Sequence, residues 1–159
     1  MIALIQRVTQ AQVQVGGRPV GTIGRGILAL IGVQRDDDRA AARRLLERVL
    51  GYRIFADPDG RMNLHLEEVR GSLLLVPQFT LAADTRKGTR PGFSTAAAPE
   101  QAQALFQYLL DHARKSGVAV AAGCFGAHMQ VSLTNDGPAT FWLEVPGHTA
   151  GRTEALKFT

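Results

Sequence analysis

The sequence predicts an α/β fold in which mixed, largely antiparallel sheets pack with two main helices in a single domain. Short aliphatic runs recur between turn residues, and two longer segments repeat apolar residues at helical spacing. No repeat or linker divides the 159 residues, a length that can bury a core without disulfide or metal. We therefore predict one domain over residues 1–145, followed by a C-terminal tail over residues 146–159.

The first half of the chain predicts a hairpin, a central strand and a helix. Gly16 and Gly17 suit a tight hairpin turn. The aspartates at positions 36–38 suit the positive end of a helix dipole, so we interpret them as a solvated cap rather than a metal site. The helix is predicted over residues 39–50, before Gly51. The predicted strands are residues 2–8, 12–15, 20–23, 27–31 and 52–55.

The second half predicts four further strands and the second helix. That helix covers residues 99–116, with proline in its first turn and Gly117 beyond its end. A turn at residues 135–138 is predicted to separate the last two strands. The tail from residue 147 has weak periodicity, and we expect it to be loosely attached. The predicted strands are residues 73–76, 118–122, 127–133 and 140–145.

Composition favours a reducing compartment and permits a nucleic-acid partner. The single cysteine, Cys124, excludes an internal disulfide. No signal peptide or membrane span is recognisable, so we expect a cytoplasmic protein. The formal net charge is +4, and most of the excess comes from arginine, which pairs with phosphate in a bidentate way.

A polar pair follows the aliphatic run of residues 73–76. If the alternation of a strand continued, Gln78 and Thr80 would share the face of Leu74, and Phe79 would lie on the opposite face. A buried amide and a buried hydroxyl each need a hydrogen-bond partner. The pair is therefore either hydrogen-bonded structure or the lining of a pocket.

Familiar catalytic machinery is missing from the sequence. The four histidines lack metal-binding spacing, no serine lies in a nucleophile elbow, and Cys124 has no neighbour that would lower its pKa. An enzyme with this sequence would act by positioning, by backbone donors, or with a reactive group of its substrate.

Two loops contain the remaining candidate binding residues. The loop of residues 82–93 holds Arg86, Lys87 and Arg90, which suit contact with phosphate groups or an ordinary solvated loop. Gly137 and Pro138 suit either a plain hairpin turn or a rigid cis turn. A cis turn would fix two carbonyl oxygens side by side, which suits recognition of an ammonium group.

Two motifs together resemble the signatures of the D-aminoacyl-tRNA deacylases. They are VPQFTLAADT at residues 76–85 and QVSLTNDGPATFW at residues 130–142. The resemblance covers about residues 1–145, and the paired motifs are specific to that family. Supporting matches lie at residues 1–9, 50–55, 60–64, 90–94 and 125–127.

The resemblance implies a homodimer that hydrolyses the ester between a D-amino acid, or glycine, and the terminal adenosine of tRNA. Gly137 and Pro138 match the family's cis pair, which reaches into the other subunit's pocket, holds the α-amino group and excludes an L side chain. Asn135 belongs to the same expected substrate-binding set, and Arg7 is expected to brace the turn. Steric exclusion of the L side chain suits discrimination between mirror-image amino acids, because a pocket that only attracts a D side chain could not strongly reject its mirror image.

The resemblance also implies chemistry without a metal, a cofactor or a protein nucleophile. The ribose 2′-hydroxyl of the tRNA assists attack, while backbone N–H groups near Phe79 stabilise the oxyanion. Thr80 is expected to orient the site or form a structural hydrogen bond, with a nucleophilic role left open, and Gln78 to fix the pocket backbone. We expect Arg86, Lys87 and Arg90 to bind tRNA.

One departure from the family leaves alternatives open. Pro77 stands where serine is usual, which removes a hydroxyl and an N–H donor. Proline there resembles a related deacylase branch that edits L-alanine on tRNA, in which the Gly-Pro bond is trans and a small residue replaces the phenylalanine. Phe79 and the turn of residues 135–138 match the D-specific branch. A non-catalytic RNA-binding dimer is the third hypothesis.

Overall fold

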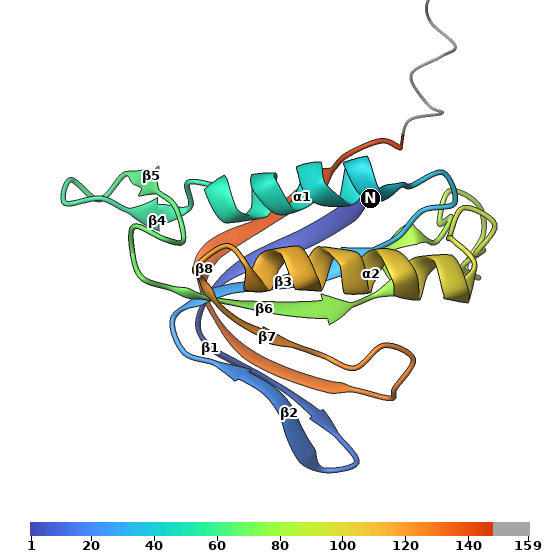
Figure 1. Cartoon of the computed structure of the whole chain (residues 1–159), viewed down its shortest axis with the longest axis horizontal. Coiled ribbons are helices and arrows are strands. Elements are labelled where there is room, and N and C mark those ends of the chain that lie inside the picture. Colours follow the sequence, from blue (N-terminus) through green and yellow to red (C-terminus); the bar gives the residue numbers. More distant parts are fainter. Residues whose placement is uncertain (148–159) are drawn as a thin grey trace, which may run out of the picture.

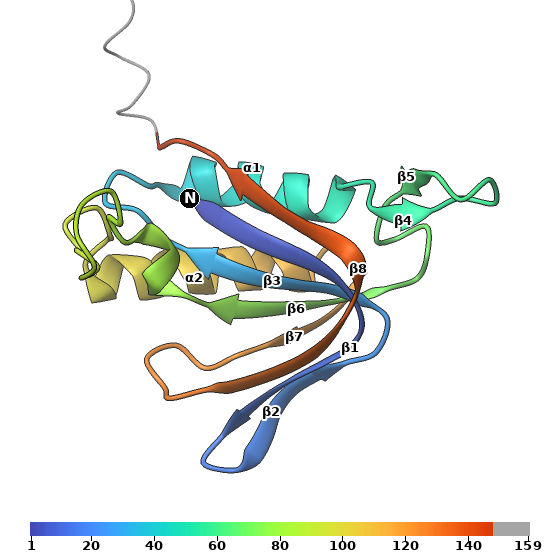
Figure 2. The same ribbon diagram turned by 180° about the vertical axis from the view of Figure 1, so that it is seen from behind.

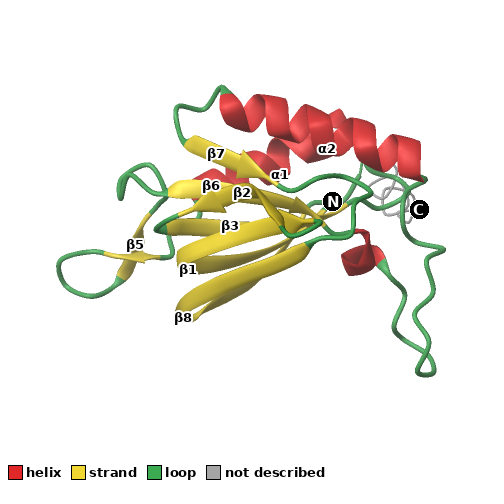
Figure 3. Cartoon of the chain, turned by 90° about the horizontal axis from the view of Figure 1, so that it is seen from below, coloured by secondary structure: helices red, strands yellow, loops and turns green. Residues whose placement is uncertain are grey.

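Two helices lie on one face of a twisted sheet, and the first hairpin extends away from them (Figures 1 and 3). A computed structural model describes residues 1–147, so residues 148–159 of the predicted tail lie outside the described residues. The strands are β1 (Ile2–Val15), β2 (Arg18–Ile23), β3 (Gly26–Gly32), β4 (Phe55–Ala56), β5 (Met62–Leu64), β6 (Ser72–Pro77), β7 (Ala119–Ala122) and β8 (Gln130–Glu144). The helices are α1 (Arg39–Gly51), the short 3₁₀ turn η1 (Phe79–Ala82) and α2 (Pro99–Arg114).

The main sheet is mixed, and β1 is its organising strand. The strand order is β2-β1-β3-β6-β7, with β8 also paired to β1. The pairs that include β1 are antiparallel, whereas β3–β6 and β6–β7 are parallel. Strands β4 and β5 form a separate small hairpin. The predicted fold class is confirmed.

Strand β1 is longer than the sequence predicted. The predicted strands of residues 2–8 and 12–15 are one continuous strand. Its first half pairs with β3, from Ile2 opposite Gly32 to Val8 opposite Gly26, and its second half pairs with β2. The polar residues at 9–10 interrupt the apolar pattern without ending the strand, because Val8 and Gln10, on either side of an irregularity at Thr9, both pair with β8.

The turn predicted at residues 135–138 is wrong, because these residues lie within the long strand β8. Residues 127–133 and 140–145 were predicted as two strands separated by a turn at 135–138, but β8 runs continuously along β1. Thr140 pairs with Gln6 and Asn135 pairs with Val8, so the residues between them bulge out of the ladder. Glycine and proline therefore mark an irregularity within one long strand here rather than a hairpin turn.

Figure 2 shows the twisted sheet from behind. Strand β2 contacts β7, although these two strands share no ladder. A Cβ added to Gly21 of β2 would lie 2.7 Å from the carbonyl oxygen of Ala122 in β7. Such a distance is below van der Waals contact, so only glycine fits where the two strands meet.

Apolar side chains fill both faces of this twisted sheet. One cluster packs the helices on the sheet and includes Ile5, Leu75, Leu45 and Phe106. A second cluster lies on the opposite face and includes Val8, Val13, Leu28, Leu74 and Val76. The aliphatic runs of β3 and β6 are thus apolar on both faces because both faces are buried.

The aspartates before α1 do not act as one solvated cap. Asp38 is the N-cap, and its side chain accepts a hydrogen bond of 2.8 Å from the N–H of Ala41. Asp37 is instead buried and contacts the α-amino group of Met1. The predicted cap is correct for Asp38 and wrong for Asp37, whose charge is satisfied by a group far away in sequence.

The strand predicted at residues 52–55 is wrong in its extent. Strand β4 contains only Phe55 and Ala56, while Tyr52 is the C-cap of α1. Tyr52 is apolar because of packing rather than because it belongs to a strand: its ring lies 5.7 Å from the Phe141 ring, centroid to centroid.

Replacing Gly21 with alanine should destabilise the protein by about 1–3 kcal/mol, because the new methyl group must displace backbone at the β2–β7 approach. Urea denaturation of Gly21→Ala measures this change. Gly24→Ala is the matched control, since a Cβ there meets nothing within 4 Å. Equal stabilities of the two variants would contradict the close approach of β2 and β7.

Candidate functional site

A cavity of about 450 Å³ opens where β6 ends. Its wall is formed by the end of β6, the start of η1, the first turn of α2 and the segment that enters β8. The lining residues are Pro77, Gln78, Phe79, Ala97, Pro99, Ala102, Phe125, Gly126, Ala127, His128, Met129 and Val131. The wall is mainly apolar with a few polar groups, as in many small-molecule sites.

The backbone turns sharply as it enters this cavity wall. The N–H of Gln78 donates a 2.7 Å hydrogen bond to the carbonyl of Ile31, and η1 then begins at Phe79. The predicted alternation is therefore wrong beyond Pro77, and Thr80 does not continue the core-facing row of Leu74. Two features explain this: β7 pairs with β6 only up to Leu75, and proline has no N–H for a ladder.

The expected catalytic residues divide between two hollows on either side of η1. Gln78 and Phe79 line the cavity described above, whereas Thr80 lines a second hollow of about 670 Å³ together with Arg86 and Trp142. The Gln78 side-chain amide nevertheless donates a hydrogen bond to the Thr80 hydroxyl. The polar pair is thus hydrogen-bonded structure and cavity lining at once.

Phe79 is the most exposed aromatic ring of this region. The residue is 58% exposed, and its ring lies 5.1 Å from that of Phe93, centroid to centroid. The first N–H groups of a helical turn have no partner inside the turn. The N–H groups at the start of η1 are therefore available to an acceptor placed beside Phe79.

The segment around Gly137 is held firmly on one side and open on the other. Asn135 donates through its side-chain amide to the carbonyls of Arg7 and Ala139, both at 3.1 Å. Ala139 is buried, whereas residues 135–138 are exposed. The Gly137–Pro138 peptide bond is cis.

Arg7 binds this segment from the neighbouring strand. Its Nε donates to the Asp136 carbonyl at 2.9 Å and lies 3.1 Å from an Asp136 carboxylate oxygen. Its Nη1 donates to the carbonyl of Ile54 at 2.6 Å. Arg7 therefore connects the bulge in β8 to the segment between α1 and β4.

Within one chain, the structure does not bring Gly137 and Gln78 together. Arg7, which contacts the bulge, pairs with Ile27 at the start of β3, and Ile27 pairs with Leu73 at the start of β6. Gln78 follows the opposite end of β6. The two parts of the expected site lie at opposite ends of the sheet.

The predicted phosphate-contacting loop is closed by a short backbone bridge between Asp84 and Gly92. Arg86 lies 2.7 Å from the Asp84 carboxylate, and this hydrogen-bonded guanidinium holds the pKa of that carboxyl well below its ordinary value. Lys87 and Arg90 are exposed. The three cations are thus not equivalent, since Arg86 already has an acidic partner.

Sequence reasoning missed several cavity residues. Phe125 and Met129 lie in or next to irregular segments where periodicity gives no signal, as does Phe93, which packs on Phe79 outside the cavity lining. The segment of residues 125–127 matched the family, and that match could have indicated its role in the site. Within residues 1–147, no three side chains could hold a metal ion, and no helix is long and apolar enough to cross a membrane.

Comparisons with known proteins place this chain among the enzymes that hydrolyse ester bonds. It is 66% identical over 144 residues to the D-aminoacyl-tRNA deacylase of Alkalilimnicola ehrlichii, covering 91% of this chain and 96% of that protein. It is 59% identical over 145 residues to the protein of the same name from Cronobacter sakazakii, covering 91% and 100%. A family model described as D-Tyr-tRNA(Tyr) deacylase matches residues 4–144, and the chain belongs to that family.

Solved structures agree with the fold. A structure titled "c-Myc DNA Unwinding Element Binding Protein" has a TM-score of 0.87 and 37% identity, covering 92% of this chain and 100% of that one. A structure of a probable eukaryotic D-amino acid tRNA deacylase has a TM-score of 0.76 over 91% and 98% of the two chains. At 22% identity, the second comparison shows the fold alone.

Replacing Arg7 with alanine should destabilise the protein by about 2 kcal/mol, because two carbonyl acceptors and one carboxylate lose their donor. Urea denaturation measures the change. The control is Arg18→Ala at an exposed position of β2, which should change stability by less than about 0.5 kcal/mol. If both variants lose the same stability, Arg7 does not brace the bulge.

Proposed function

We propose that this protein hydrolyses the ester bond between a D-amino acid and the terminal adenosine of tRNA, releasing free tRNA and the amino acid. The observation that carries the proposal is its 66% identity, over 91% of its length, to a protein named D-aminoacyl-tRNA deacylase. Glycine, which has no side chain to exclude, would be a second substrate. The protein would act in the cytoplasm, where translation takes place.

The cavity beside Phe79 is proposed to receive the aminoacyl end of the tRNA. It combines an apolar wall with backbone N–H groups at the start of η1, which would stabilise the oxyanion that forms during ester hydrolysis. Gln78 and Thr80 would hold the local backbone through their mutual hydrogen bond. The ribose 2′-hydroxyl of the substrate would assist the attack, so the protein contributes positioning and electrostatic stabilisation.

Gly137 and Pro138 are proposed to select the substrate from a second subunit. Their carbonyls would accept hydrogen bonds from the α-amino group, and their backbone would leave no room for an L side chain. The support is geometric: the segment is exposed, is held by Arg7 and Asn135, and lies at the far end of the sheet from Gln78 in its own chain. A site that needs both parts must draw them from two chains.

The long edge of β8 supports such a homodimer. Among residues 1–147, β8 forms a ladder with β1 alone, which leaves its other edge without a neighbouring strand. Leu133 and Trp142 on this strand are exposed, Trp142 by 51%. Unpaired strand edges and exposed aromatic side chains are commonly covered by another chain.

The loop of residues 82–93 is proposed to contact the tRNA backbone. Lys87 and Arg90 are exposed and would bind phosphate groups directly. Arg86 would contribute while it remains paired with Asp84. The formal charge of +4 would favour association with RNA in general.

Pro77 favours a second candidate, the editing of L-alanine on tRNA. It lines the cavity beside Gln78 and replaces the usual serine. The bulky ring of Phe79 in the same wall favours the D-specific branch, which retains phenylalanine at this position. The two candidates differ in the chirality of the amino acid that they release.

Incubation with D-Tyr-tRNA and L-Tyr-tRNA should release only the D-amino acid, because the second subunit would exclude the L side chain. Chirally resolved chromatography of the released amino acid is the measurement, with Gly-tRNA and L-Ala-tRNA as parallel substrates. Equal rates on both tyrosyl substrates would contradict chiral selection, and release of L-alanine alone would support the editing branch. Binding of tRNA without any hydrolysis would indicate a non-catalytic RNA-binding dimer.

Mixing two inactive variants should restore activity if each site combines two subunits. Phe79→Asp would damage the exposed cavity wall, and Gly137→Val would displace the selecting segment, since its Cβ would overlap the Asn135 side chain. In a refolded equimolar mixture, one site of each heterodimer is intact, so about one quarter of wild-type activity should return. Each variant alone is the control, and a mixture as inactive as its components would contradict the shared site.

A further inference from the structure

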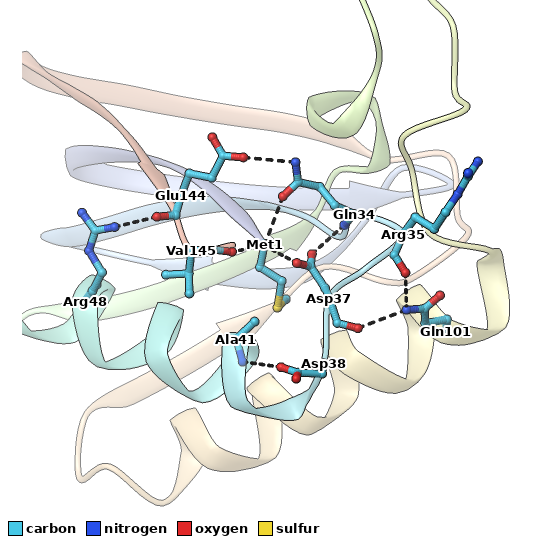
Figure 4. A network of polar contacts seen from close by, with 10 residues as sticks. All are labelled: Met1, Gln34, Arg35, Asp37, Asp38, Ala41, Arg48, Gln101, Glu144 and Val145. Atoms are coloured by element: carbon cyan, nitrogen blue, oxygen red, sulfur yellow. Dashed lines mark hydrogen bonds and ion pairs between the residues drawn. The ribbon is translucent and has the colours of Figure 1, made fainter. Parts of the chain in front are cut away.

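The α-amino group of Met1 lies in a polar site formed by distant segments (Figure 4). It donates to a carboxylate oxygen of Asp37 at 2.5 Å, to the carbonyl of Val145 at 2.5 Å and to the side-chain oxygen of Gln34 at 3.2 Å. The Met1 residue is 0% exposed and Asp37 is 5% exposed. The contact with Asp37 is therefore shielded from solvent, where charge interactions are weakly screened, and the contacts with Val145 and Gln34 are partly buried.

The chemistry of the site matches an unmodified ammonium group. An ammonium group has three N–H donors, and three acceptors surround this nitrogen. An acylated or extended nitrogen would keep one N–H, lose the positive charge and need room for an added carbonyl group beside these three acceptors. At most one of the three acceptors would then keep its hydrogen bond from this nitrogen, and the loss is costly at buried and partly buried groups.

The positive charge of the Met1 amine compensates the buried carboxylate of Asp37. Burial raises the pKa of the Asp37 carboxyl, and hydrogen bonds from the Met1 ammonium and from the Gln34 N–H, the latter at 2.6 Å, oppose that shift. Within the part of the chain that the structure describes, Asp37 is the only buried charged side chain. Removing one partner of a buried ion pair leaves an uncompensated charge and destabilises the fold.

The contacts extend from this site to both helices. Gln101 of α2 donates to the carbonyls of Arg35 and Asp37, at 2.9 and 3.1 Å. Gln34 also donates to the Glu144 side chain, and Arg48 of α1 donates to the Glu144 carbonyl. The Met1 nitrogen thus lies where β1, the end of β8 and the loop before α1 meet, within one bond network that reaches α1 and α2.

We propose that the α-amino nitrogen of Met1 is a modification-sensitive site whose acylation or extension disrupts the junction of β1, β8 and α1. A chain that starts with N-formylmethionine would have to lose its formyl group before this junction closes. In that hydrolysis, water attacks the formyl carbon, the carbon–nitrogen bond breaks, formate leaves and the amine takes up a proton. This proposal does not rest on the deacylase function.

The test compares the full chain before and after removal of a short N-terminal extension by a protease that leaves Met1 as the first residue. The extension should raise the unfolding equilibrium constant on the order of 100-fold, measured by urea denaturation. An extended chain that gains its native circular dichroism only after cleavage also supports the proposal. The control is the same extension placed after Thr159, which should change the constant by less than about threefold.

Asp37→Asn separates the loss of charge from the bulk of the extension. Without the buried carboxylate, the extension should change the unfolding constant by less than about tenfold, because no charge is left unpaired. An extension that changes nothing in the wild-type chain would overturn the proposal. An extension that is equally harmful in wild type and in Asp37→Asn would overturn the role of the ion pair.

Discussion

The antiparallel pairing of β1 with β8 is the constraint on which the rest of the structure depends. Their ladder runs from Ile2 opposite Glu144 to Gln14 opposite Gln130, so the two ends of the domain are joined along their full length. One register places Val145 beside the Met1 amine and the bulge of β8 beside Arg7. Because a strand has a period of two residues, a slip by one position would break both contacts and expose the core side chains of β1.

This ladder also separates the two parts of the expected site. The cavity beside Phe79 is formed where the parallel strands end, whereas the Gly137 segment is held near the place where they begin. In the proposed site, the cavity would supply an apolar wall and backbone donors, and the exposed segment would supply carbonyl acceptors. Under the proposed function, a site that uses both parts would combine two subunits, and the edge of β8 that has no neighbouring strand within residues 1–147 would suit their contact.

Much of the fold was predictable because local patterns and tertiary packing agree. The Gly16–Gly17 hairpin, the helices, the aliphatic strands β3 and β6 and the Asp38 cap all follow from periodicity and turn chemistry. The errors share another origin. Residues 135–138 were predicted as a turn because glycine and proline commonly form one. The residues before and after them nevertheless both pair with β1, so β8 remains one strand. Thr80 left the predicted face because β6 loses its neighbour β7 and the chain turns into η1.

The sequence by itself determined the fold class, the family and the identity of the polar groups, because these depend on residue types and their spacing along the chain. Only the tertiary structure decided where those groups act. It buried Asp37 against Met1 rather than leaving it at a helix end, and it placed Gln78 and Gly137 at opposite ends of one sheet. Such contacts join residues far apart in sequence, and their register is set by the packing of the whole chain rather than by any local pattern.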